Sequence, residues 1–215
     1  MNELTHEEAR VLGCLLEKEM ATPEYYPMTI NSLLAACNQK TARNPVVAYD
    51  TPDVEVALEG LRDKRYTGLM HQSGARAAKH KHRIEDEFPD LGKPERAILA
   101  LLLLRGQQSA SEVRSRSERL CVIADNEAAE TALQGLIDHQ PEALVQRIPL
   151  GGGRHTVTYV HLLCGEPEIV ENAAPAAVAT AAAPSSSIRE DIAGLRKELD
   201  ELRQEFDAFR DSVGG

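Results

Sequence analysis

The sequence predicts an α+β protein that is mainly α-helical, carries small β-hairpins and contains a duplicated unit. The pattern E-x-A-L-x-G-L-x-D occurs at residues 55–63 and again at 130–138. Each copy follows two helical patterns and precedes two strand patterns that are separated by a turn. Three helices followed by a two-stranded hairpin are typical of a winged-helix domain. We therefore expect two tandem winged-helix domains, over residues 1–90 and 91–165.

The repeated helix is the centre of each predicted domain. Its Ala, Leu, Gly and Leu fall on one face, where Gly lets a neighbouring backbone approach at a cost of about 1 kcal/mol in helix propensity. Chance similarity between two amphipathic helices is the alternative explanation. The shared order of the flanking patterns favours duplication.

The first domain begins with a helix that starts at a capping box. Thr5 precedes apolar residues at helical spacing, and Glu8 lies three positions after it. Two prolines end this helix, and Met28 is expected in a short strand. Thr29 is expected to cap a second helix over residues 30–37.

A long connection, the repeated helix and a hairpin complete the first domain. The expected ranges are 38–51 for the connection, 53–65 for the helix, 67–72 and 80–85 for the strands, and 73–79 for the turn. The second domain follows the same order. Its expected helices are 93–105, 109–117 and 125–139, and its strands are 144–150 and 156–162. Ser109 is the expected cap of its middle helix. The glycines at 151–153 lack the Gly-Lys-Ser/Thr ending of a phosphate loop, so they are interpreted as a hairpin turn.

Beyond residue 165 the composition changes twice. Residues 166–187 are rich in Ala, Pro and Ser and are interpreted as a linker. Residues 188–213 carry a heptad repeat that is typical of a coiled-coil helix. The predicted seam consists of Ile188, Ile192, Leu195, Leu199, Leu202, Phe206 and Phe209.

The charges beside this seam favour a parallel pairing. The e positions are Arg, and the charged g positions are Asp or Glu. A parallel pair places g of one helix beside e of its partner, which is attractive, whereas antiparallel pairing sets like charges together. We expect a parallel homodimer. A trimer, favoured by two Phe in the seam, and a helix docked on its own globular part are the alternatives.

The overall charge neither requires nor excludes a polyanionic partner. The net charge is -10, and residues 166–215 contribute most of it, with 5 basic and 11 acidic residues. Local patches therefore decide what is bound. Aromatic residues make up 4% and Trp is absent, which argues against a base-stacking surface for single strands.

The residue pattern argues against a metal site, a membrane span and an enzyme. Four cysteines are scattered without metal-ligand spacing, and Cys14 and Cys37 are interpreted as small core residues. No signal segment begins the chain, and the longest apolar run, residues 97–104, is too short to cross a membrane. No catalytic constellation is found. We expect a cytoplasmic, non-enzymatic protein without a metal or cofactor.

Double-stranded DNA is the partner that winged helices most often bind, through the third helix and the hairpin. Here each third helix begins among Asp and Glu, which suit a helix N-terminus better than a phosphate. The candidate phosphate contacts are Lys40, Arg43, Arg76, Lys79, Lys81, Arg83, Arg114, Arg116 and Arg119. A solvated face is the alternative for each cluster. Asn38 is expected to cap a helix rather than to contact a base.

Two stretches carry a resemblance to a known family. Residues 37–46 read CNQKTARNPV, and residues 112–120 read EVRSRSERL. Both resemble the signatures of the YceH-like bacterial protein family, with the resemblance covering residues 3–165. The family pattern has Asn in place of Ala42 and Asp in place of Asn44, which concerns a detail of the connection. The resemblance implies a tandem winged-helix fold and supplies no activity, because the role of the family is uncharacterised.

Two functions follow as hypotheses. In the first, a dimeric, non-enzymatic protein binds duplex DNA through phosphates, using the first hairpin and the Arg-rich helix of the second domain, with transcriptional regulation as one role. In the second, the acidic tandem winged helices form an adaptor that binds another protein without touching nucleic acid. The chromosome-condensation accessory subunits that this layout resembles bind partners in that way.

Overall fold

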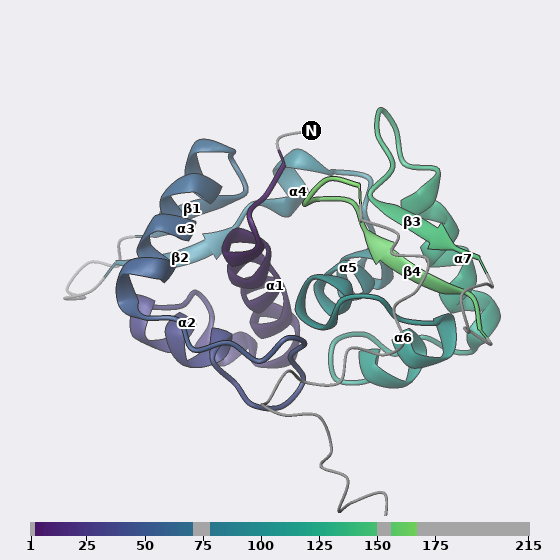
Figure 1. The fold of residues 1–215 in the computed structure, drawn as a ribbon, viewed down its shortest axis with the longest axis horizontal. Helices are drawn as coiled ribbons and strands as arrows, with labels where there is room; N and C mark the ends of the chain where they lie inside the picture. The colour runs from purple at the N-terminus through teal and green to yellow at the C-terminus, as the bar shows by residue number, and fades with distance from the viewer. Residues whose placement is uncertain (1–2, 71–77, 150–155, 167–215) are drawn as a thin grey trace, which may run out of the picture. The chain divides into compact units, whose positions relative to one another are not determined.

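The computed structural model describes residues 3–70, 78–149 and 156–166. All of these described residues belong to one compact unit. Within these ranges the chain has seven α-helices and two small antiparallel hairpins (Figure 1), which confirms the predicted α+β class. The predicted coiled-coil seam, the predicted linker beyond residue 166, the turn at 151–153 and Arg76 lie outside the described residues.

The first repeat follows the predicted order of elements. They are α1 (His6–Ala21), the short 3₁₀ helix η1 (Pro23–Tyr25), α2 (Ile30–Cys37), α3 (Thr51–Asp63), β1 (Thr67–Met70), β2 (Lys79–His82) and α4 (Ile84–Glu87). The capping box of α1 is present, because Thr5 accepts from the Glu8 amide at 3.2 Å and donates its own amide to the Glu8 carboxylate at 2.7 Å. Helix α3 begins earlier than predicted because Asp50 and Asp53 form a capping box there.

The second repeat has the same succession of helices and strands. They are α5 (Lys93–Arg105), α6 (Ala110–Ser117), α7 (Asn126–Ile137), β3 (Val145–Ile148) and β4 (Thr158–His161). Ser109 caps α6 as predicted, and its capping box includes Glu112. Both strands are shorter than predicted, because the pairing stops at Val145 with His161 and at Ile148 with Thr158.

The end of the first hairpin differs from the prediction. Strand β2 ends at His82, although the sequence predicts a strand to residue 85. Ile84 is fully buried, and its carbonyl accepts from the Phe88 amide at 2.7 Å. Residues 84–87 therefore form a helical turn, whose acidic side chains suit a helix N-terminus.

Each hairpin gains one further bridge from the segment before the second helix of its repeat. Met28 pairs with His80 in the first repeat, where the sequence predicts a short strand, and Gln108 pairs with Tyr159 in the second. The two bridges occupy equivalent places, which supports the interpretation of the sequence as a duplication.

Helices α1 and α5, the first helices of the two repeats, pack side by side (Figure 1). The approach is close at Gly13, where a β-carbon would lie 3.0 Å from the β-carbon of Leu103. All residues from 97 to 104 are buried, so this part of α5 is covered on every side. The backbone amide of Asn44 also donates to the Leu104 carbonyl at 2.9 Å. Both repeats therefore share one hydrophobic core.

Candidate nucleic-acid interface

Residues 38–50 connect α2 to α3 and contain two of the predicted phosphate contacts. Asn38 ends α2 as predicted, and its side-chain amide forms two 2.8 Å hydrogen bonds with the backbone of Tyr49. The amide therefore closes the connection and is not free to contact a base. Lys40 is exposed to solvent.

Arg43 is buried, which corrects its prediction as a phosphate contact. Its guanidinium donates to both carboxylate oxygens of Glu17 on α1, at 3.1 and 2.7 Å, and to the Ala36 carbonyl on α2 at 3.1 Å. The side chain of Arg43 is 0% exposed. Burial alone would lower the pKa of Arg43, but the hydrogen bonds and charge of Glu17 raise it above its ordinary value. Arg43 therefore binds the connection to α1 and α2.

The hairpin β1–β2 directs its lysines outward. Along β2, His80 and His82 are buried whereas Lys79 and Lys81 are only half-buried, as the alternation of a strand requires. The Nε2 atom of His82 lies 2.7 Å from the carboxylate of Glu19, and this hydrogen bond lowers the pKa of Glu19. The two imidazoles thus point into the interior, where His82 has a carboxylate partner, and the two lysines point the other way.

Arg83 follows β2 and is half-exposed. Its Nε atom lies 3.4 Å from the carboxylate of Asp86. A surface ion pair of this kind contributes little free energy, so it does not prevent Arg83 from contacting a phosphate. We call Lys79, Lys81 and Arg83 the hairpin cations.

Three arginines belong to α6 or to the turn that follows it, and Arg119 lies in that turn. Arg116 donates to the Gln108 side-chain oxygen at 2.8 Å and to the Glu112 carboxylate at 3.0 Å, so it stabilises the start of α6. Arg114 and Arg119 are exposed, and the Arg114 Nε atom donates to the Asn126 side chain at 3.0 Å. We call Arg114 and Arg119 the helix cations.

The hairpin cations and the helix cations belong to different parts of the molecule. Hairpin β1–β2 lies with α2 and α3 on one side of the α1 and α5 pair, and α6 lies with α7 on the other (Figure 1). They therefore form two patches, and only an extended ligand can meet both.

The N-termini of α3 and α7 carry negative charge, as the sequence predicts. Asp50 and Asp53 cap α3, and Asp125 caps α7 through a 2.8 Å hydrogen bond from the Ala128 amide. Carboxylates that satisfy helix amides in this way repel a phosphate at the same place. The third helix of each repeat is thus poorly suited to meet a nucleic-acid backbone with its N-terminus.

Sequence reasoning missed the buried charges of α1. Arg10, Cys14 and Glu17 follow one another at spacings of four and three, which places them on one helix face. Cys14 and Cys37 are fully buried, which confirms their interpretation as core residues, and the Arg43 guanidinium lies 3.6 Å from the Cys14 sulfur. The sequence did contain one signal for these buried charges, because Arg10 and Glu17 share a helix face with Cys14. Their partners could not be found from it, since they lie far away in the chain.

Two kinds of site are not found among residues 3–70, 78–149 and 156–166. No group of three or more His, Cys, Asp or Glu is placed to hold a metal ion. No helix in these ranges combines the length and apolar character needed to cross a membrane.

Comparison with known proteins identifies relatives over most of the chain. The family described as "Protein of unknown function, DUF480" matches residues 4–154. A "UPF0502 protein" of Geobacter metallireducens is 50% identical over 163 residues, covering 75% of this chain and 72% of that protein. A second, of Vibrio campbellii, is 40% identical over 199 residues, covering 91% and 89%. A third, of Solibacter usitatus, is 40% identical over 208 residues and covers 97% of both chains.

Proposed function

The chain belongs to the DUF480 family of proteins of unknown function, and we propose that it is a non-enzymatic duplex-DNA-binding protein made of tandem winged-helix domains. The predicted membership of an uncharacterised bacterial family is confirmed. The names of the relatives carry no activity, so the proposal rests on the residues of this chain.

The succession of elements supports the winged-helix assignment. Each repeat has three helices and a two-stranded hairpin, and one bridge joins the hairpin to the segment before the second helix. In a winged helix this bridge is the third strand of the sheet, and the hairpin is the wing. The exposed wing is the part that lies along the DNA backbone.

The hairpin cations carry the proposal. Strand β2 buries two imidazoles and directs Lys79 and Lys81 to solvent, and Arg83 continues this basic edge. The helix cations, Arg114 on α6 and Arg119 in the turn after it, supply a second contact point in the other repeat. Because all these groups are suited to phosphates and none is shown at a base edge, we propose backbone contacts that position the protein, with transcriptional regulation as one role.

Fluorescence anisotropy of a labelled random duplex, titrated with full-length protein over a salt series, tests this proposal. Binding at micromolar protein that weakens steeply with salt is expected, because each neutralised phosphate releases counterions. Flat anisotropy at low salt would contradict DNA binding.

A protein-interaction adaptor is the second candidate, and two exposed valines favour it. Val56 on α3 is 69% exposed and Val122, before α7, is 80% exposed. Each lies near the acidic start of a third helix, a surface better suited to a basic partner protein than to DNA. Under this proposal Val56→Asp abolishes capture of partner proteins by the full-length chain, and neither the native chain nor the variant binds duplex DNA.

We also propose that a parallel coiled coil joins two copies of this chain into a homodimer in the cytoplasm. The seam from Ile188 to Phe209 would join two copies. Sedimentation of the full chain and of a chain that ends at Gly165 compares their masses. A dimer that persists after truncation would contradict the proposed seam.

A further inference from the structure

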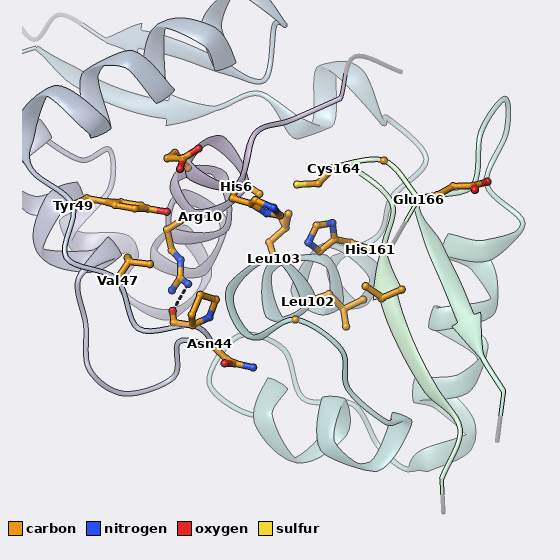
Figure 2. A pocket seen from close by; sticks show the side chains of 16 residues that line it. His6, Arg10, Asn44, Val47, Tyr49, Leu102, Leu103, His161, Cys164 and Glu166 are labelled. Carbon is orange, nitrogen blue, oxygen red and sulfur yellow. Dashed lines mark hydrogen bonds between the residues drawn. The ribbon is translucent and has the colours of Figure 1, made fainter. Parts of the chain in front are cut away.

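A cavity of about 820 Å³ lies between the two repeats (Figure 2). Its walls come from α1, the connection 38–50, α5, β4 and the segment that follows β4. Its volume lies in the range that binds small organic molecules. The basic residues proposed to contact DNA do not line it, so its role is independent of the proposed function.

One wall of the cavity contains a buried cation, Arg10, that forms no ion pair with residues 3–70, 78–149 or 156–166. Arg10 is 3% exposed, and its Nη2 atom donates to the Pro45 carbonyl at 2.5 Å. Its Nη1 atom is buried and has no hydrogen-bond partner among the described residues. Burial lowers the pKa of Arg10, Cys14 partly opposes this shift, and the nearby charge of Arg43 adds to it. An uncompensated buried guanidinium is costly, and an anion beside it would offset that cost.

A second unpartnered polar atom belongs to the opposite repeat. His161 on β4 lies across the cavity from Arg10 (Figure 2), and its Nδ1 atom is buried without a partner in the described part of the chain. Burial, with a smaller contribution from the charge of His6, lowers the pKa of His161 to about 4. The neutral ring therefore offers one nitrogen that accepts a hydrogen bond.

The rest of the lining restricts the kind of molecule that fits. Leu102, Leu103 and Val160 give the cavity apolar walls, which suit a hydrocarbon or aromatic body. Glu7 and Glu166 also line it, and their carboxylates oppose a ligand with several negative charges. A single carboxylate therefore fits better than a nucleotide or a polyphosphate.

We propose that this cavity binds a small organic acid, with one carboxylate at Arg10, a hydroxyl or amide donor at His161 and an apolar body against Leu102, Leu103 and Val160. Arg10 comes from the first repeat and His161 from the second. Such a ligand would contact both repeats at once.

Heteronuclear NMR of the full chain tests the proposal with mandelate and indolelactate, which combine a carboxylate, a hydroxyl and an aromatic ring. Both acids are expected to shift the amide signals of Arg10, Val160 and His161. Mandelamide, which lacks the charge, is expected to bind about tenfold more weakly, the difference of one charged hydrogen bond. Phenylacetate, which lacks the hydroxyl, tests the contact at His161 and should be weaker by a smaller factor.

Two variants localise the binding. Arg10→Lys keeps a charge but replaces the two terminal guanidinium nitrogens by one ammonium nitrogen, which cannot reach both the Pro45 carbonyl and the ligand in the same way, and it should weaken mandelate binding about tenfold. Because this variant alters a buried group, Val47→Trp serves as the second test. It fills the cavity from the half-buried connection and should abolish the shifts while circular dichroism stays unchanged. Equal affinities for mandelate and mandelamide would overturn the proposal. So would the absence of any shift in the amide signals at the cavity with mandelate and with indolelactate at about 10 mM.

Discussion

The carboxylate of Glu8 lies directly against the α-carbon of Gly60 and leaves no room for a β-carbon there. Glu8 is held in this place from both sides, by the Thr5 amide at 2.7 Å and by the ammonium group of Lys64. The second repeat has the same pairing between Glu95 and Gly135, but there the approach is looser, and a β-carbon would lie 4.0 Å from the carboxylate. The duplicated glycines thus have different constraints.

Alanine at the two glycines should have opposite effects on stability. Gly60→Ala would displace Glu8 and break its capping box and ion pair, so we expect a loss of about 1 kcal/mol in the free energy of unfolding after the gain in helix propensity. Gly135→Ala should increase that free energy by about 0.5 to 1 kcal/mol. Urea unfolding of both variants measures the difference. Equal stabilisation by both would show that Glu8 moves at no cost.

Ala42 offers a test of backbone strain in the connection. Its φ of 60° lies in the left-handed region, which costs an L-residue about 1 to 2 kcal/mol. Ala42→Gly removes this strain. Glycine also raises the conformational entropy of the unfolded chain, which offsets part of the gain, so we expect the free energy of unfolding to rise by about 0.5 kcal/mol. Ala42→Val should instead destabilise the protein, because a β-branched residue is least tolerated there. Thermal unfolding of both variants reports the sign, and a stabilising Val would refute the assignment.

Arg43 and Lys40 lie in the same connection but should behave differently. Arg43→Met removes both hydrogen bonds from the guanidinium to Glu17 and leaves this half-buried carboxylate with Lys18, at 3.3 Å, so we expect a loss of about 3 kcal/mol in unfolding free energy. Lys40→Met is the matched control and should change stability by less than about 0.5 kcal/mol, because Lys40 is exposed. Chemical denaturation measures both. A loss with Arg43→Met no larger than with Lys40→Met would contradict the structural role of the buried ion pair.

If the hairpin contacts DNA, one lysine should be enough to show it. Lys81→Glu is expected to lower duplex affinity about fivefold and to reduce the slope of log K against log salt by about one. Lys93→Glu makes the same change of charge at an exposed position of α5, outside both proposed patches, and should have a smaller effect. Anisotropy titrations at three salt concentrations compare the two. Identical losses would indicate that only net charge matters.

The half-buried His161 should make the free energy of unfolding depend on pH. Its pKa of about 4 in the folded protein is below the unfolded value of about 6.5, so the folded state binds fewer protons between these values. The contribution of His161 to the free energy of unfolding is therefore fully present above pH ~6.5 and is lost as the pH falls toward ~4. Its magnitude is on the order of 3 kcal/mol. His161→Gln should show a flatter profile in urea midpoints over that range. A profile parallel to that of the native chain would place the proton-linked group elsewhere.

Much of the local structure could be predicted, because its determinants lie within a few residues of one another. The caps Thr5, Thr29 and Ser109 were predicted from their own neighbourhoods, and α2 and α5 have the predicted bounds. The ends of α3, β3 and β4 differ from the prediction by a few residues. Residues 84–87 were predicted as strand but form a helical turn, because Ile84 is buried, and the alternation of side chains does not reveal that burial. The candidate site was less predictable, because the local sequence around a basic loop residue does not show whether its side chain is exposed, as in Lys40, or buried, as in Arg43.

The sequence by itself determined the duplicated order of helices and strands, since periodicity and capping act over three or four residues. Only the tertiary structure decided which charges face solvent. Arg10 meets the Pro45 carbonyl 35 positions away, and Arg43 meets Glu17 26 positions away. The cavity between Arg10 and His161 likewise exists only because α1 packs on α5 and brings the two repeats together. Burial is a property of packed segments that are distant in the chain, so no local pattern contains it.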